Sequence, residues 1–434
     1  MIKLAYPIDS KLDKVITLPG SKYLANRLLI LAALSETNSS LSNMPHNEDI
    51  DTSIKGLTQL GAKFEWQGNR LNCQGFKPNQ AYQSDQIYSS HSGSFSRFVM
   101  PMLALSDQGV SISGSAKMNS RPMAELFRVL EQLGATIVSE NQSPASTLPV
   151  KVTGPIKGGE IAMSGSTSSQ YISALLMTAG KLPLGLTIKL TAEPVSKPYL
   201  QMTLDLLGIF GIEVATDAQL GEFIIHPNQH YQGVDYQLES DPSSASYFLA
   251  AAAISGGHIC ISNFYPDRSI QGEAQFARVL QLMGCKIWQD QQGYHCQGPE
   301  QLKAVTVDMG DMPDVVQTLA VVAMFAEGTT VMNNIANLAF KESNRIEDTA
   351  TEIRKTGIEV TTTVESLVIH GSSLSGPPKA AILDTHDDHR MAMSLALMAI
   401  KIADVKIRDP QVVAKSFPDY WQYLQQLGYS VEQI

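Results

Sequence analysis

The chain has 434 residues, of which 44% are hydrophobic and 17% are charged. This length is ample for a buried core and indicates two or more domains. The formal net charge of −10 argues against general attraction to nucleic acid or to an anionic membrane surface. We therefore expect neither as a partner, and any site for anions must be local.

The four cysteines show no CxxC spacing, so the sequence indicates neither a disulfide framework nor a zinc site. Residues 1–14 lack the apolar core of a signal peptide, and no apolar run reaches membrane-spanning length. We expect a cytoplasmic protein that holds neither a metal nor a cofactor.

One short phrase recurs along the chain. It consists of an amphipathic helix that ends at a glycine, followed by a β-like run. The six glycines, spaced 71 to 77 residues apart, are Gly61, Gly134, Gly211, Gly284, Gly357 and Gly428. A glycine after a helix suits a left-handed carboxyl cap, and near-equal spacing indicates an internal repeat.

Each repeat also contains an earlier helix that is rich in Ala, Leu and Met on nearly all faces. These helices are expected over 21–34, 93–105, 166–180, 241–257, 312–328 and 387–404. Their composition predicts burial, whereas the second helix of each repeat should be half exposed. Short β runs are expected at 110–114, 186–191, 258–264, 329–334 and 405–409. The repeat is therefore an α/β unit of about four short strands and two helices.

Six such units divide most naturally into two globules of three. Candidate boundaries lie near residues 18–21 and 238–241, with the amino-terminal strand at 1–8 belonging to the last three units. The expected domains are 1–20 plus 240–434, and 21–239. Because the chain would cross twice between them, we expect an active site in a cleft between the domains.

The segment 337–345 offers cations and a carboxylate beside a helix start. Asn344 predicts a cap, and Gly357 predicts the end of the same helix. Arg345 then lies in the first turn, where the helix dipole disfavours a cation unless an anion shares the site. Lys341 and Glu342 precede it on the loop. The alternative is a solvated loop with a Lys–Glu pair.

The openings of the buried helices are rich in hydroxyl groups and cations, which bind phosphate or carboxylate well. The residues concerned are Lys22, Arg27, Ser94, Ser96, Arg97, Ser166, Thr167, Ser168, Ser169, Gln170, Asp387, Asp388, His389 and Arg390. Together they predict a site for one or two small, multiply charged anions. Each also has a structural alternative: helix caps for the hydroxyls, an ion pair for Arg97, and a buried, satisfied imidazole for His389.

Several longer stretches carry a resemblance to a known family. They are LPGSKYLANR, KMNSRPM, GSTSSQYISALLMTA, VSKPYLQMTL, FKESNRI, DDHRMAMSLAL and AKSFPDYW. In these the chain resembles the enolpyruvyl transferases, and among them those that act on shikimate 3-phosphate. The resemblance implies a two-domain inside-out α/β barrel fold with six βαβαββ-like repeats, three per domain. It also implies transfer of the enolpyruvyl group of phosphoenolpyruvate to the 5-hydroxyl of shikimate 3-phosphate, with release of phosphate.

The resemblance assigns residues to each substrate. For shikimate 3-phosphate they are Lys22, Tyr23, Arg27, Ser168, Ser169, Ser196, Tyr199, Asp314, Asn337 and Lys341. For phosphoenolpyruvate they are Lys22, His91, Gly93, Arg121, Gln170, Arg345, Arg390 and Lys415. Addition and elimination through a tetrahedral intermediate need groups that exchange protons. The candidates are Lys22, Asp314 and Glu342. We expect a monomer whose partners are these two small molecules.

Two departures from the family pattern stand out. Tyr23 replaces a serine, and the segment HSGSFSR places His91 where the family has asparagine. These changes predict altered pocket shape, pH dependence and sensitivity to glyphosate, because histidine titrates near neutrality. Two alternatives remain open: a paralogue with another acceptor alcohol, and a non-catalytic two-lobed anion-binding protein. The carboxylates Asp314 and Glu342 argue against the latter.

Overall fold

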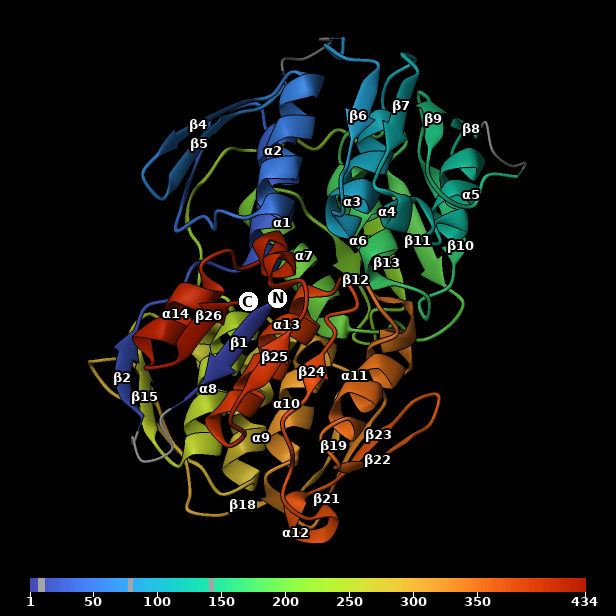
Figure 1. Ribbon diagram of the computed structural model, residues 1–434. Helices are drawn as coiled ribbons and strands as arrows, with labels where there is room; N and C mark the ends of the chain where they lie inside the picture. Colours follow the sequence, from blue (N-terminus) through green and yellow to red (C-terminus); the bar gives the residue numbers. More distant parts are fainter. Residues whose placement is uncertain (7–11, 77–80, 140–143) are drawn as a thin grey trace. The chain divides into compact units, whose positions relative to one another are not determined.

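The computed structural model describes residues 1–6, 12–76, 81–139 and 144–434, and it shows a mixed α/β protein. Contacts divide the chain into two compact units (Figure 1). Unit 1 comprises Met1–Pro19 and Glu239–Ile434, and unit 2 comprises Gly20–Leu238. The expected domain boundaries differ from these by one residue at each crossing. The strand expected at 1–8 is β1 (Ile2–Ala5), and residues 7–11 lie outside the described part of the chain.

Unit 2 contains three four-stranded sheets. The first has the order β14 (Asp235–Gln237), β3 (Ser39–Ser42), β5 (Arg70–Gln74) and β4 (Lys63–Gln67). The second is β6 (Gln86–Tyr88), β7 (Val110–Ser113), β9 (Val150–Thr153) and β8 (Thr136–Val138). The third is β10 (Gly159–Met163), β11 (Leu186–Leu190), β13 (Glu222–Ile225) and β12 (Ala215–Thr216). In each sheet the first pair is parallel and the other two are antiparallel.

Unit 1 repeats this pairing pattern in three sheets of its own. They are β2 (Asp13–Ile16), β15 (His258–Ile261), β17 (Tyr294–Gln297) and β16 (Lys286–Gln289); then β19 (Thr306–Asp308), β21 (Thr329–Asn333), β23 (Leu367–His370) and β22 (Glu359–Thr362); and β24 (Ile382–Leu383), β25 (Val405–Ile407), β1 and β26 (Ser430–Gln433). A parallel pair, β18 (Leu302–Lys303) and β20 (Ala326–Glu327), completes the described strands.

The helices are of two kinds, as the sequence predicted. Buried on nearly all faces are α1 (Lys22–Leu34), α3 (Gly93–Leu103) and α6 (Ser169–Ala179) in unit 2, and α8 (Pro242–Ser255), α10 (Val316–Ala323) and α13 (His389–Ala396) in unit 1. Partly exposed are α2 (Glu48–Leu60), α5 (Ala124–Gln132), α7 (Lys197–Ile209), α9 (Phe276–Leu282), α11 (Arg345–Arg354) and α14 (Tyr420–Gln426). Within unit 2 the buried helices α1, α3 and α6 contact one another, and within unit 1 α10 contacts both α8 and α13.

Short helices fill the connections. They are α4 (Ala116–Asn119), α12 (Ser372–Ser375), and the 3-10 turns η1 (Pro266–Arg268), η2 (Gly272–Gln275), η3 (Pro313–Val315), η4 (Ala336–Phe340), η5 (Leu397–Ile400) and η6 (Pro410–Lys415). Two expected helices are shorter than predicted. The helix expected at 312–328 begins with η3, which contains a proline, and its last residues pair as β20 with β18. The helix expected at 387–404 tightens into η5 after Ala396.

The six repeat glycines adopt the left-handed backbone that the sequence predicted. Their φ angles lie between +81° and +115°. Each follows the last residues of a half-exposed helix and turns the chain toward the next strand, for example at Gly61 after α2 and Gly284 after α9. Glycine adopts this conformation without the penalty that a Cβ atom imposes.

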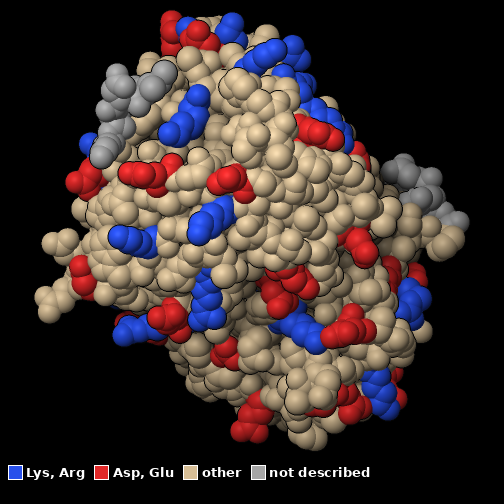
Figure 2. Space-filling view, turned by 90° about the horizontal axis from the view of Figure 1, so that it is seen from below, with Lys and Arg blue, Asp and Glu red and all other residues tan. Residues whose placement is uncertain are grey.

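The surface in Figure 2 shows basic and acidic side chains interspersed, without a broad basic patch on that face. In the described part of the chain, we find no helix that combines the length and the apolar character needed to span a membrane.

Candidate active site

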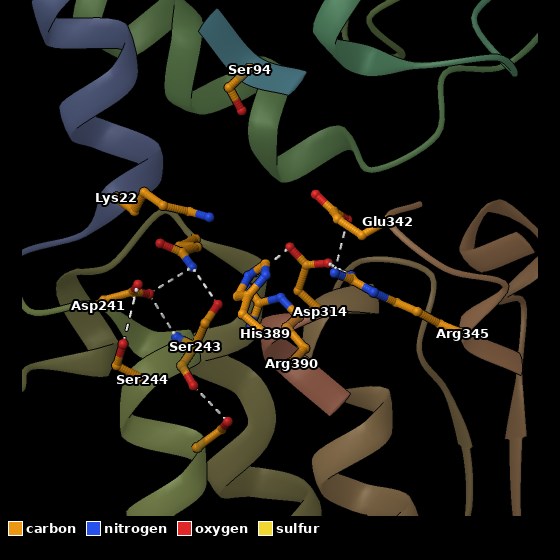
Figure 3. A network of polar contacts seen from close by, with 12 residues as sticks. Lys22, Ser94, Asp241, Ser243, Ser244, Asp314, Glu342, Arg345, His389 and Arg390 are labelled. Carbon is orange, nitrogen blue, oxygen red and sulfur yellow. Dashed lines mark hydrogen bonds and ion pairs between the residues drawn. The ribbon is translucent and has the colours of Figure 1, made fainter. Parts of the chain in front are cut away.

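Arg345 is the centre of a buried ion cluster in unit 1. It is the first residue of α11, and the Asn344 side chain caps that helix. The Arg345 guanidinium donates to Asp314 Oδ1 at 2.7 Å and to Glu342 Oε2 at 3.0 Å (Figure 3). It also donates to Asp388 Oδ2 at 2.8 Å. Burial opposes the charge, but attraction to Asp388, Glu342 and Asp314 raises the pKa of Arg345 above its ordinary value. The described anions beside the start of α11 are thus carboxylates of the protein itself.

The cluster continues through two further cations. Arg390, the second residue of α13, donates to Asp314 Oδ2 at 3.3 Å and to the Tyr247 hydroxyl at 3.2 Å. Lys415 donates to Glu342 Oε1 at 2.7 Å. Each carboxyl group therefore lies between two cations: Asp314 between Arg345 and Arg390, and Glu342 between Arg345 and Lys415. Burial raises the pKa of Tyr247 to about 12, although the two arginines partly oppose this shift.

Asp388 holds both arginines in place. It caps α13 by accepting from the Arg390 backbone N–H at 2.9 Å, and it also accepts from the Arg345 guanidinium and from the Ser343 hydroxyl. The residues before it, His386 and Asp387, have φ angles of +51° and +54°. This strained turn is fixed by the buried Glu352 of α11, which contacts the His386 ring and the Asp384 backbone N–H, each at 2.8 Å. Both ends of α11 are thereby tied to the segment that leads into α13.

The remaining site residues predicted in unit 1 lie on the segment before α11. Asn337 belongs to η4, and Lys341 follows that turn directly before Glu342. Both side chains are partly buried. His389 is buried beside Asp388, with Nδ1 3.6 Å from the carboxylate.

In unit 2, Lys22 is the first residue of α1 and directly follows the N-cap residue Ser21. Its ammonium group lies 3.1 Å from Asp49 Oδ2, and both side chains are buried. Asp49 comes from the first turn of α2, so the pair joins the starts of two helices. The pair places a buried ammonium group beside a buried carboxylate, and each charge compensates the cost of burying the other.

Arg27 lies one turn further along α1 and is buried. It donates to the Thr203 hydroxyl at 2.8 Å and to the backbone carbonyls of Tyr23 and Tyr199 at 3.1 and 3.2 Å. Burial lowers the pKa of Arg27 to about 10, and the nearby Tyr199 and Tyr23 partly oppose that shift. At neutral pH it remains a cation whose described hydrogen bonds all go to neutral oxygen atoms.

Two tyrosines flank this arginine. The rings of Tyr23 and Tyr199 lie 5.0 Å apart in a tilted arrangement, and the Lys22 ammonium group lies 5.6 Å from the Tyr23 ring. The predicted residue Ser196 precedes α7 in a left-handed conformation with φ +54°. Ser168 caps α6 by accepting from the Gln170 backbone N–H.

A second group in unit 2 gathers at the starts of α3 and α6. Gln170 contacts Arg97 at 2.6 Å and Ser94 at 3.2 Å. A Cβ atom at Gly93 would lie 2.4 Å from Arg121 Nη1, so only glycine permits the arginine to approach this closely. His91 is exposed and shares a 3.0 Å hydrogen bond with Ser115.

Each unit therefore brings several predicted residues together at helix starts. Sequence reasoning did not identify the partners of two carboxylates that organise these groups. Asp49 neutralises Lys22, and Asp388 orients Arg345 and Arg390. The sequence places Asp388 among the helix-start residues of the predicted anion site, but it does not indicate that Asp388 contacts Arg345. In both cases the sequence shows an acidic residue at a helix start. The partner of that residue cannot be identified without the fold.

Known proteins match the chain along nearly its whole length. Residues 7–424 match the family described as EPSP synthase (3-phosphoshikimate 1-carboxyvinyltransferase). Curated relatives with that enzyme name are 37% identical in Photobacterium profundum over 429 residues and in Escherichia coli over 426 residues. In both comparisons the match covers 96% of this chain and 97% of the relative.

Solved structures agree in fold. Two structures of EPSP synthase from Acinetobacter baumannii match with a TM-score of 0.82, and each comparison covers 100% of both chains. At 24% and 23% sequence identity these two matches establish the fold alone. With the family match and the 37% identical relatives, the chain belongs to the EPSP synthase family.

Proposed function

We propose that this chain is a 3-phosphoshikimate 1-carboxyvinyltransferase. It transfers the enolpyruvyl group of phosphoenolpyruvate to the 5-hydroxyl of shikimate 3-phosphate and releases phosphate, a step of the shikimate pathway toward aromatic amino acids. The observation that carries the proposal is the buried cluster in unit 1, where Asp314 and Glu342 each bridge two cations. Cations bind anionic substrates, and carboxylates among them exchange protons.

Each substrate binds to its own set of residues, and Lys22 belongs to both sets. Shikimate 3-phosphate takes Lys22, Tyr23, Arg27, Ser168, Ser169, Ser196, Tyr199, Asp314, Asn337 and Lys341. Phosphoenolpyruvate takes Lys22, His91, Gly93, Arg121, Gln170, Arg345, Arg390 and Lys415. Both sets contain residues of unit 1 and residues of unit 2. The burial of Lys22 at the start of α1, and of Arg27 one turn further along the same helix, supports this division.

The chemistry is an addition followed by an elimination. The methylene carbon of phosphoenolpyruvate gains a proton while the acceptor 5-hydroxyl loses one and attacks C2, which gives a tetrahedral intermediate. Loss of a proton from the new methyl group then expels phosphate. Lys22, Asp314 and Glu342 are the proton-exchange groups, because an arriving anion competes with the carboxylates for the same cations and favours their protonated forms.

The proposed function also implies a repeated architecture for each domain. Each domain is an inside-out α/β barrel of three βαβαββ-like repeats. The parallel–antiparallel–antiparallel pairing, found in three described sheets of each unit, supports the repeat. We further propose that the enzyme is a cytoplasmic monomer that needs no metal or other cofactor.

The decisive experiment is phosphate release from phosphoenolpyruvate with and without shikimate 3-phosphate. Release should require shikimate 3-phosphate, and Lys22→Ala should reduce it by at least 100-fold. Lys189→Ala is the matched control, because Lys189 on β11 forms an exposed ion pair with Glu160 on β10. It should release phosphate at the unaltered rate.

Other outcomes would reject the proposal in different ways. Binding of shikimate 3-phosphate without phosphate release would indicate a different second substrate or a non-catalytic protein. Failure to bind shikimate 3-phosphate at all would show that the acceptor is wrong.

A further inference from the structure

Arg97 is buried beside the residues assigned to phosphoenolpyruvate, yet the assignment above gives it no role. It lies on α3, one turn after Gly93, and is 5% exposed. Its Nη1 atom donates to Gln170 Oε1 at 2.6 Å and to the Gly93 carbonyl at 3.4 Å. The guanidinium lies 5.7 Å from the ring of Tyr171, whose hydroxyl is held by the Pro122 carbonyl. The hydrogen bonds to Gln170 and Gly93, together with the packing on the Tyr171 ring, therefore fix the position of the Arg97 guanidinium.

This contact decides which way the Gln170 side-chain amide faces. A guanidinium has donors and no acceptor, so the amide oxygen must point toward Arg97. The amide nitrogen is then on the opposite side, where it donates to Ser94 Oγ at 3.2 Å. Because Ser94 accepts this bond, its own proton is directed elsewhere. Arg97 therefore donates to Gln170, and Gln170 donates to Ser94, so the hydrogen bonds of the three side chains form a chain and all point the same way.

Such a chain presents hydrogen atoms to a ligand, which suits an acceptor with a negative charge. A second cation strengthens the preference. A Cβ atom at Gly93 would lie 2.4 Å from Arg121 Nη1 and 3.0 Å from Arg97 Nη1, so both guanidinium groups lie close to the start of α3. If the amide were reversed, its oxygen would face the anion and repel it.

We propose that Arg97 is a positioning residue that sets Gln170 and Ser94 as donors for the anionic groups of phosphoenolpyruvate. The proposal rests on the proposed function, since it takes Gln170 as a ligand of that substrate. It assigns Arg97 an effect through Gln170, and it replaces the idea that Arg97 only stabilises the fold.

The test is a double-mutant cycle on the purified full-length enzyme, with Arg97→Met, Gln170→Ala and the double variant. Arg97→Met should raise the KM for phosphoenolpyruvate about tenfold, as expected for loss of one charge-assisted hydrogen bond. The KM for shikimate 3-phosphate should change less than twofold. In the Gln170→Ala background, Arg97→Met should change the KM for phosphoenolpyruvate less than threefold, because the group that it orients is gone.

Arg128→Met is the matched control. Arg128 is exposed on α5, and its described hydrogen bond goes to the Ala162 carbonyl, so its loss should leave both KM values unchanged. If Arg97→Met does not fold, Arg97→Lys decides. An ammonium group can still donate to the amide oxygen, so this variant should stay within threefold of the unaltered enzyme.

Each contrary result has a distinct meaning. If Gln170→Ala raises the KM for phosphoenolpyruvate but Arg97→Met does not, the role of Arg97 is wrong and the proposed site stands. If the two effects simply add, Arg97 does not act through Gln170. If Gln170→Ala has no effect, both the inference and the assignment of Gln170 fail. A tenfold rise in Arg97→Lys would also overturn the inference.

Discussion

Arg27 and Arg345 are both buried arginines, but their surroundings differ in charge. Arg345 contacts three carboxylates, whereas the described hydrogen bonds of Arg27 go to one hydroxyl and two carbonyls. A buried cation with neutral partners carries an uncompensated desolvation cost, which is why the pKa of Arg27 falls to about 10. A carboxylate ligand would compensate that cost.

Arg27→Lys should therefore weaken the binding of shikimate 3-phosphate selectively. Lysine keeps the charge but cannot form the two parallel hydrogen bonds that a guanidinium makes with a carboxylate. We expect the KM for shikimate 3-phosphate to rise 10- to 100-fold, corresponding to about 1.5–3 kcal/mol. The KM for phosphoenolpyruvate should change less than threefold. Steady-state kinetics with each substrate varied in turn measures both.

Arg354→Lys provides the control, since Arg354 is exposed on α11 and donates to the Val360 carbonyl. Equal changes in both KM values for Arg27→Lys would contradict a specific role and indicate general distortion of α1.

At this scale the sequence predicted residue types better than partners. The dipole argument correctly indicated that Arg345 needs negative charge, but the sequence could not show that Asp388, 43 residues later, supplies part of it. Likewise Asp49 was not recognised as the partner of Lys22. Contacts between distant residues depend on how helices pack, and local pattern does not contain that information.

At the scale of single elements, the glycines after the helices show how local chemistry determines where helices end. Gly357 has φ +90° with open space around the position that a Cβ atom would occupy. Any penalty for a side chain there comes from the backbone conformation alone. Gly208, inside α7, also has open space, but it is not among the residues with positive φ.

Alanine should therefore have opposite effects at these two positions. Gly357→Ala should lower the free energy of unfolding by about 1–2 kcal/mol, because it forces an L-residue into the left-handed region. Gly208→Ala should raise it by about 0.5–1 kcal/mol, because alanine loses less entropy in a helix. Urea unfolding monitored by circular dichroism compares them. Two changes of the same sign would show that the backbone explanation is incomplete.

The six buried helices and the six glycine caps were predictable because both follow from residues next to one another in the sequence. The short edge strands were not. β12 has two exposed residues and no alternation of apolar and polar side chains that could reveal it. Some strands also pair across long stretches of chain: β14 and β3 are about 195 residues apart, so their pairing depends on the assembled fold.

At the scale of the whole molecule, Glu239 is the first residue of unit 1 after the chain leaves unit 2. Ser269 donates to its Oε1 atom at 2.6 Å. Burial nevertheless raises the pKa of Glu239 to about 7, Ser269 partly opposes the shift, and the neighbouring Asp241 adds to it. A carboxyl group with a raised pKa binds its proton more tightly in the folded protein than in the unfolded chain.

Stability should therefore fall as the pH rises from about 4.5 to 7, by about 1–3 kcal/mol from this group. Glu239→Gln should remove that part of the pH dependence, because the amide does not ionise. Calorimetric melting temperatures between pH 5 and 8 provide the measurement. Glu193→Gln is the control, since Lys197 lowers the pKa of the exposed Glu193 and no similar loss should occur in this range. If the melting temperature depends on pH in Glu239→Gln as it does in the unaltered protein, Glu239 is not the source of the lost stability.

The first strands of unit 1 have partners that are far away in the sequence. β2 pairs with β15, and β1 lies between β25 and β26. During translation, β1 must therefore wait for the ribosome to add about 400 residues, which takes roughly 20 to 80 s at about 5–20 residues per second. All of unit 2 emerges in the meantime. The backbone N–H and C=O groups of β1 therefore lack their native partners for that time, and premature termination anywhere before residue 405 would leave β1 without either partner strand.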